Sequence, residues 1–204
     1  MKKLYILFLF LVSFQLFGQN KNIIELQDYW YNKAKNDLNN QKINSAFIGY
    51  YFSYEIVPNS SLGEKSLKIS DSLKNILRKE LIKNLIGNWK IKFPKKIKSK
   101  KDKEQYNQLG KILMITNDSI FYFKRKKDLK FKKYLSSQKI SFCNLETLFP
   151  IYADIIHSNK IIWNYHINKR KNILTITKSG ELLSIGNRTE IISHASGCIY
   201  HRIK

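Results

Sequence analysis

Hydrophobic and polar residues follow two different periods along this chain, and the change between them falls near Gly87. Before that residue, leucines recur at helical spacing, as Leu73, Leu77, Leu81 and Leu85. After it, apolar and polar residues alternate, as in a strand that buries one face. The pattern therefore predicts a small helical module over residues 19–86 and a β module over residues 87–204, which is an α+β architecture.

The first module is predicted to contain three helical segments. Residues 23–39 and 43–56 form the first two, and Pro58 ends the second because the residue before a proline disfavours helix. The third runs from about residue 62 to 86. Ser70 or Asp71 could cap a restart inside it, so one long helix and two shorter ones both remain open.

The first two helices resemble a single tetratricopeptide repeat. The likeness rests on a Trp, two alanines, a Tyr and a closing Pro at the family's spacing: Trp30, Ala34, Ala46, Tyr50 and Pro58. Lys33 and Asp37 depart from the family, which has Leu and Tyr there. The alternative is an ordinary helical hairpin covered by the third helix. The resemblance implies contact with a peptide or protein partner rather than catalysis.

The β module contains about nine or ten short strands separated by brief turns. The clearest begins at Gly87, and two others, 111–116 and 119–124, meet at a tight turn over Asn117–Asp118. Further strands are predicted at 130–135, 138–142, 160–167, 172–178, 181–185, 189–193 and 198–203, with a turn at Ser179–Gly180 and a short helix or lid over 144–158. The connections are too short for crossover helices, so an antiparallel barrel or sandwich is expected.

Gly87-Asn88-Trp89, at the start of the first strand, resembles the Gly-x-Trp signature of the lipocalin superfamily. Arg202 stands near the end of the last strand, where that family often packs a basic side chain over the signature Trp. The resemblance implies an antiparallel up-and-down β-barrel in which Arg202 stacks on Trp89. The family's Thr-Asp-Tyr-like stretch is absent, and the alternative is that Gly87 only ends a helix while Trp89 is ordinary core.

The first residues have the organisation of a signal peptide. Lys2 and Lys3 precede an apolar run over residues 4–12, and a cleavage site follows Gly18. The run is too short to span a bilayer comfortably. We expect residues 1–18 to be removed and the remaining chain to be exported, to a periplasm or outside the cell, with no transmembrane segment.

The formal net charge is +22. A balance this basic suits nucleic acid, an anionic membrane surface or an acidic polymer. Lys greatly outnumbers Arg, however, and nucleic-acid readers rely on Arg for bidentate contacts, so no nucleic-acid partner is expected. The alternative is that the many Lys, Asn and Ile residues reflect an AT-rich genome.

In an up-and-down barrel, the connections after the first and third strands emerge at the same end. The first carries six lysines, among them Lys95 and Lys96, and the second carries Lys126 and Lys127. A basic rim there would favour an apolar or amphiphilic ligand with an anionic head, or docking onto an anionic surface. The alternative is a pair of solvated loops. For the lining of a cavity, the sequence suggests the face that bears Trp163 and Tyr165.

Motifs for known catalytic or cofactor sites are not found in the sequence. The four histidines have no Cys or carboxylate at metal-ligand spacing: His157, His166, His194 and His201. We therefore expect no catalytic residue, no metal and no cofactor. Cys143 and Cys198 could pair in an oxidising compartment or remain two separate thiols, since spacing alone does not decide.

The leading hypothesis from the sequence is an exported, non-enzymatic protein whose lipocalin-like barrel binds a small hydrophobic or amphiphilic ligand. The alternative is a cell-envelope interaction protein, in which the helices contact a partner and a filled barrel serves as scaffold. An unrecognised hydrolase is a third, weaker hypothesis.

Overall fold

The computed structural model describes residues 22–92, 109–145, 150–184, 186–190 and 198–203. The chain forms two compact units, Met1–Leu77 and Arg78–Lys204. The expected signal peptide, residues 1–18, lies outside the described residues. Among the helices that are described, none combines the length and the apolar character needed to cross a membrane.

The first unit is helical. Residues 22–39 form one helix, and α2 spans Ile43–Ile56. The third helix, α3, runs without interruption over Ser61–Leu85, so its last residues belong to the second unit. Ser70 does not restart a helix, since α3 continues through it. Its hydroxyl donates a hydrogen bond to the carbonyl of Phe47 in α2 (3.4 Å).

The residues that carry the tetratricopeptide likeness are contact residues of a helical hairpin. Ala34, Ala46 and Tyr50 are buried, and the Trp30 ring packs on Phe52 with 5.1 Å between centroids. Ala34 faces Gly49 so closely that a Cβ added at Gly49 would lie 2.9 Å from the Ala34 Cβ. Small residues at these positions allow the two helices to approach.

A buried polar cluster ties the start of α3 to this hairpin. The Gln27 amide donates hydrogen bonds to the carbonyls of Ser53 (2.8 Å) and Val57 (3.1 Å), and the Ser60 hydroxyl donates to the Gln27 amide oxygen (3.0 Å). The Ser66 hydroxyl in α3 reaches the Ser53 hydroxyl (3.1 Å). The third helix is therefore hydrogen-bonded to the helical pair and covers it.

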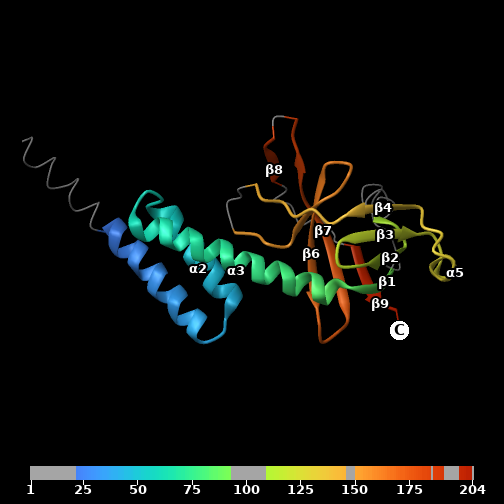
Figure 1. Ribbon diagram of the computed structural model, residues 1–204, viewed down its shortest axis with the longest axis horizontal. Coiled ribbons are helices and arrows are strands. Elements are labelled where there is room, and N and C mark those ends of the chain that lie inside the picture. Colours follow the sequence, from blue (N-terminus) through green and yellow to red (C-terminus); the bar gives the residue numbers. More distant parts are fainter. Residues whose placement is uncertain (1–21, 93–108, 146–149, 185, 191–197, 204) are drawn as a thin grey trace, which may run out of the picture. The chain divides into compact units, whose positions relative to one another are not determined.

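The second unit is built on one antiparallel sheet, in which nine strands are formed by described residues (Figure 1). The strands are β1 (Gly87–Ile91), β2 (Ile112–Ile115), β3 (Ser119–Phe123), β4 (Ser136–Lys139), β5 (Asp154–Ile156), β6 (Ile161–Asn168), β7 (Ile173–Leu182), β8 (Arg188–Glu190) and β9 (Cys198–Arg202). Their order is β4-β3-β2-β1-β9-β7-β6-β5, with β8 paired to β7. Apart from β8, strands that follow one another in the chain lie side by side, except β4 and β5, which stand at the two ends of this order. The last strand, β9, pairs with the first, so the order is up-and-down.

The sheet curls, and the segment that follows β4 at one edge reaches β5 at the other edge. After β4, the Cys143 amide donates to the carbonyl of Asp154 in β5 (2.9 Å), and the Ile156 amide donates to the carbonyl of Ser141 (2.8 Å). Phe142 forms an isolated antiparallel bridge with Ile155 between these bonds. The predicted α+β architecture with a curled antiparallel sheet is therefore confirmed.

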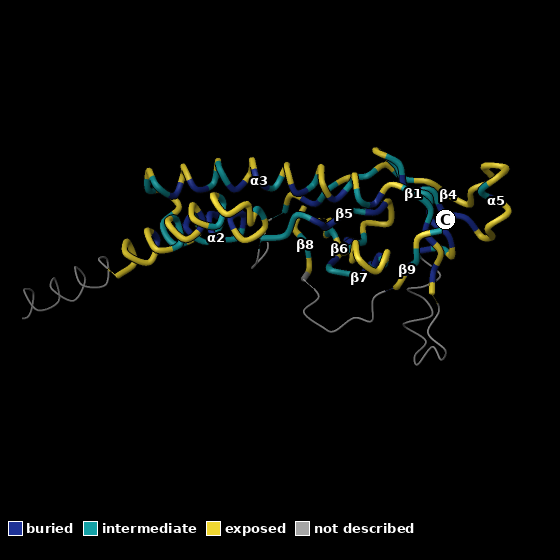
Figure 2. Tube along the Cα trace, turned by 90° about the horizontal axis from the view of Figure 1, so that it is seen from below, coloured by how far each residue is buried: buried dark blue, intermediate teal, exposed yellow. Residues whose placement is uncertain are grey.

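The concave side of the sheet holds a continuous hydrophobic core. Side chains from β1, β2, β3, β5, β6, β7 and β9 meet there with Leu81 and Leu85 of α3. The largest of them have almost no exposed surface: Trp89, Trp163, Tyr165, Tyr200, Leu113 and Ile155. Figure 2 contrasts this burial with the exposed residues along α5 (Lys126–Lys130). The interior is packed with side chains contributed by most of the strands.

Three local predictions were wrong. The strand expected at 130–135 is replaced by the end of α5 and a turn with Lys132 at φ 51°. The stretch expected as helix or lid contains strand β5. The predicted turn at Ser179–Gly180 is absent because β7 continues to Leu182, with an irregularity in its pairing to β6 between Ile162 and Trp163.

Candidate functional site

The C-terminus of α3 is capped by side chains from the first and last strands. The Trp89 indole N–H donates to the Leu85 carbonyl (2.7 Å). The Arg202 guanidinium lies 4.9 Å from the Trp89 ring centroid and donates to the carbonyls of Asn84 and Ile86, each at 2.8 Å. The contact implied by the lipocalin resemblance is present, and it also satisfies carbonyls that a helix end leaves without partners.

Gly87 allows the chain to pass directly from α3 into β1. Its φ of +135° lies in a region that other residues rarely adopt. A Cβ at this position would lie 3.6 Å from the Arg202 side chain. Gly87, Trp89 and Arg202 therefore act as one structural unit.

Trp163 and Tyr165, the predicted cavity lining, lie on the concave face and are 0% and 1% exposed. They share the interior with His157, which follows β5, and Tyr122 of β3. The Tyr165 hydroxyl and His157 Nε2 are hydrogen-bonded (2.9 Å), and the Tyr122 hydroxyl lies 3.5 Å from His157 Nδ1. We call Tyr122, His157, Trp163 and Tyr165 the interior cluster.

Burial sets the charge of the interior cluster. Loss of water around the imidazole lowers the pKa of His157 to about 3, so this ring is neutral near pH 7. Burial raises the pKa values of Tyr122 and Tyr165, which keeps both phenols protonated. The cluster is thus uncharged at neutral pH, and it provides hydrogen-bonding groups but no fixed charge.

One polar atom of the interior cluster has no partner. The Trp163 indole nitrogen, Nε1, is buried without a hydrogen-bond acceptor among the described residues. Its ring instead packs against His157, with 5.9 Å between centroids. An unpaired buried N–H costs free energy, because the group gives up its hydrogen bonds to water.

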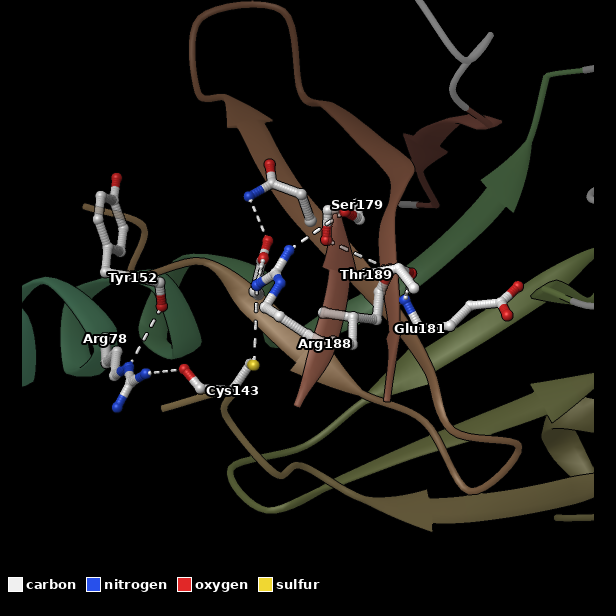
Figure 3. A network of polar contacts seen from close by, with 10 residues as sticks. Arg78, Cys143, Tyr152, Ser179, Glu181, Arg188 and Thr189 are labelled. Atoms are coloured by element: carbon white, nitrogen blue, oxygen red, sulfur yellow. Dashed lines mark hydrogen bonds and ion pairs between the residues drawn. The ribbon is translucent and has the colours of Figure 1, made fainter. Parts of the chain in front are cut away.

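A second polar network contains a buried ion pair (Figure 3). Arg188 of β8 donates to the Asp154 carboxylate (2.8 Å), and the two side chains are 5% and 1% exposed. Arg188 also reaches the Ser179 carbonyl (3.1 Å), while the Asn164 amide donates to the other Asp154 oxygen (2.8 Å). The carboxylate is therefore held by a guanidinium and an amide, as a buried charge requires.

Arg78 holds the connection between β4 and β5 (Figure 3). Its guanidinium donates to the carbonyls of Cys143 (2.7 Å) and Tyr152 (3.3 Å). It also lies over the Phe142 ring, 4.7 Å from the centroid. These contacts come from the part of α3 that belongs to the second unit, and they fix the backbone beside β5.

Cys143 and Cys198 are both buried, and no disulfide joins them in the described structure. The Cys143 thiol accepts a long contact from Arg188 (3.8 Å). Both thiols are free and buried in this structure, and Cys198 belongs to the hydrophobic core.

The basic residues predicted for the rim fall into two groups. Lys95 and Lys96 lie outside the described residues. Lys126 and Lys127 are exposed on α5, in the connection between β3 and β4. Trp163 and Tyr165 are buried in the core, so the described residues do not bring the predicted ligand-binding side chains together on one accessible surface.

Metal chemistry finds no support among the described side chains. No group of three or more His, Cys, Asp or Glu residues in these ranges could hold an ion. His166 is exposed on β6, His157 belongs to the interior cluster, and His194 lies outside the described residues. The buried carboxylate of Asp154 is already paired with Arg188.

Comparison with known protein families, curated proteins and solved structures finds no match for this chain. The interpretation of its function therefore rests on its own residues and their geometry.

Sequence reasoning named Trp163 and Tyr165 for the interior but missed their neighbours Tyr122 and His157. It also missed the Arg188–Asp154 pair. His157 directly follows the apolar pair Ile155–Ile156, which was a usable signal for a buried strand end. No spacing in the sequence links Asp154 with Arg188, because the two meet only when β8 pairs with the far half of β7.

Proposed function

We propose that this chain is an exported, non-enzymatic interaction protein of the cell envelope, with a lipocalin-like barrel that serves as a filled scaffold. The observation that carries the proposal is the near-complete burial of Trp163 and Tyr165. Side chains that line a small-molecule site of about 300–1,000 Å³ keep surface that water can reach in the ligand-free protein. These two keep almost none.

The neighbours of Trp163 and Tyr165 support the same conclusion. Leu174, Ile176, Cys198 and Tyr200, from β7 and β9, have no exposed surface. The Tyr200 hydroxyl donates to the carbonyls of Leu109 (3.2 Å) and Gly110 (2.9 Å) at the start of β2. An interior filled by large side chains from the concave face stabilises the domain, and function is left to outer surfaces.

The lipocalin-like character of the barrel belongs to the same proposal. It is supported by the up-and-down strand order and by the Arg202–Trp89 contact. Function does not follow from such a likeness, since one fold hosts many activities. The choice between a small-molecule carrier and a scaffold therefore depends on how far the interior side chains are buried.

Titration with a fluorescent fatty acid, cis-parinaric acid, tests the proposal. A filled scaffold is expected to show no saturable one-to-one binding and no energy transfer from tryptophan to the probe. The controls are Leu174→Trp, which adds bulk to the interior, and the surface variant Lys126→Gln/Lys127→Gln. Saturable uptake that Leu174→Trp abolishes and the surface variant retains would overturn the scaffold assignment.

A second candidate function, binding of a small amphiphile in the barrel, is favoured by one observation. The unpartnered Trp163 N–H lies beside three uncharged hydrogen-bonding side chains of the interior cluster. A ligand with a neutral acceptor, such as a hydroxyl or carbonyl oxygen, would satisfy that N–H after side chains rearrange. For such a carrier, Trp163→Phe should weaken a fatty alcohol at least about tenfold, the cost of one buried unsatisfied donor.

A further inference from the structure

We propose that residues Lys124–Leu135, here called the basic loop, dock this protein onto the surface of an anionic lipid bilayer. The proposal rests on the proposed function, in that it names the partner of a scaffold that acts through its outer surface. It is carried by the composition, the exposure and the ordered geometry of this connection between β3 and β4.

The charge of the basic loop is strongly one-sided. Its twelve residues include a single acid, Asp128, and seven bases: Lys124, Arg125, Lys126, Lys127, Lys130, Lys132 and Lys133. All seven bases are exposed. Asp128 is buried and paired with Arg125 (3.3 Å), so the six lysines face solvent without an acidic neighbour in the loop.

Large apolar side chains project from the same segment. Phe131 is 70% exposed and Leu135 is 66% exposed, the two highest values among the exposed large hydrophobic residues of the described chain. Tyr134 is 51% exposed, and its ring packs by an edge against Phe121, with 5.3 Å between centroids. Apolar and aromatic side chains among lysines are the composition of segments that bind at the bilayer interface.

The basic loop is held in a defined conformation. The Arg125 amide donates to the Asp128 carboxylate (3.1 Å), and the Lys133 amide donates to the Asp128 carbonyl (3.0 Å). The Leu135 amide then returns the chain to the sheet by donating to the Tyr122 carbonyl (2.7 Å). These bonds hold Phe131 and Leu135 outside the core. The two side chains are therefore exposed in a folded loop.

A bilayer fits these observations better than a nucleic acid or another polyanion. Arg125 is the one arginine in the loop and is engaged by Asp128, which leaves lysines as point charges without bidentate phosphate recognition. Leu135 has no aromatic face on which a base could stack. Clustered lysines beside a membrane attract anionic lipid headgroups, and apolar side chains add insertion into the interface.

The test is sedimentation of the chain beginning at Gln19 with two kinds of vesicle, pure phosphatidylcholine and phosphatidylcholine with phosphatidylserine. Binding to the anionic vesicles and not to the neutral ones is expected. Lys130→Gln/Lys133→Gln should weaken it by at least tenfold, at about fivefold per lysine. The matched control Lys68→Gln/Lys79→Gln removes the same charge from α3, outside the basic loop, and should weaken binding by less than about threefold.

The variant Phe131→Ser/Leu135→Ser separates insertion from simple charge attraction. It should weaken vesicle binding about tenfold or more, as buried apolar area contributes to interfacial affinity. Absence of vesicle binding would overturn the proposal, and so would equal losses in the loop and control lysine variants. Tighter binding to an RNA oligonucleotide or heparin that is insensitive to Phe131→Ser/Leu135→Ser would replace it with a polyanion site.

Circular dichroism and thermal unfolding of each variant exclude loss of the fold as the cause. The experiments distinguish failure of the filled-scaffold proposal from failure of the basic-loop proposal. Vesicle binding tests the basic loop without reference to the interior, whereas fatty-acid titration without vesicles tests whether the barrel is filled.

Discussion

The guanidinium of Arg202 lies over the indole of Trp89, 4.9 Å from the ring centroid, where the last strand pairs with the first. Both side chains also donate to carbonyls at the end of α3: Trp89 to Leu85, and Arg202 to Asn84 and Ile86. One pair of residues therefore joins the two ends of the β domain's chain and satisfies the terminus of the helix that precedes it.

Substitution Arg202→Ala should destabilise the protein by about 1–2 kcal/mol, since it removes a cation–π contact and two hydrogen bonds at a partly exposed site. Urea unfolding measures this loss. Arg170→Ala, in the exposed turn between β6 and β7, removes the same charge and should cost less than about 0.5 kcal/mol. Equal effects of the two substitutions would show that the contact contributes nothing.

The buried ion pair between Arg188 and Asp154 should be far more sensitive to single than to double substitution. Arg188→Met leaves a carboxylate buried without its cation, and a cost of about 3–5 kcal/mol is expected. The double variant Asp154→Leu/Arg188→Met removes both charges and should recover most of that loss. Thermal unfolding gives the comparison.

An exposed ion pair is the control for this experiment. Lys169 and Glu80 are 2.7 Å apart but well exposed, and Lys169→Ala should cost less than about 1 kcal/mol. If Arg188→Met cost no more than Lys169→Ala, the burial of the Arg188–Asp154 pair would be contradicted.

His157 should make the fold sensitive to acid. The pKa of this histidine is about 3 in the folded protein and about 6.5 when unfolded, because burial disfavours the charged ring. Between these values the unfolded chain binds a proton that the folded chain does not. Stability therefore falls as pH drops below about 6.5, with a loss of about 2 kcal/mol between pH 7 and pH 5.

Urea unfolding at a series of pH values measures this effect. The variant His157→Gln should flatten the dependence between pH 7 and pH 5, although it lowers stability at pH 7 by removing the bond to Tyr165. The exposed His166 serves as control, and His166→Gln should leave the slope unchanged. If the free energy of unfolding of His157→Gln still falls between pH 7 and pH 5, other groups cause the acid sensitivity.

The contact between Ala34 and Gly49 predicts an unusual sign for a helix substitution. Gly→Ala in a helix normally stabilises by about 0.5–1 kcal/mol. Here the new Cβ would lie 2.9 Å from the Ala34 Cβ, so Gly49→Ala should instead destabilise the helical unit by about 1–3 kcal/mol. The exchange Ala34→Gly/Gly49→Ala moves the methyl group to the other helix and should restore part of the loss; stabilisation by Gly49→Ala alone would contradict this packing.

Much of the fold could be predicted from the spacing of hydrophobic and polar residues over short stretches of the sequence. The change near Gly87, the hairpin at Asn117–Asp118 and the alternation around Trp89 and Trp163 depend on neighbours in sequence, and the structure follows them. The position of Arg202 over Trp89 could be expected because the family resemblance supplied a contact between distant strands.

The wrong predictions concern residues whose conformation is set by specific contacts rather than by the alternation of apolar and polar residues. Gly180 was expected in a turn, but β8 approaches it so closely that a Cβ would lie 2.1 Å from the Thr189 carbonyl oxygen, which only glycine allows within the strand. Residues 130–135 alternate like a strand, but the bonds from Arg125 and Lys133 to Asp128 form a helical turn instead. Whether the interior is filled or contains a cavity depends on the summed volumes of many side chains. No local pattern in the sequence gives that sum.

The central claim is that the barrel is filled by its own side chains. The most direct test is mass spectrometry of the protein purified from the cells that produce it naturally, measured once under native conditions and once after denaturation. The account predicts equal masses, with nothing released on unfolding. A stoichiometric small molecule, bound in the native protein and released on denaturation, would contradict it.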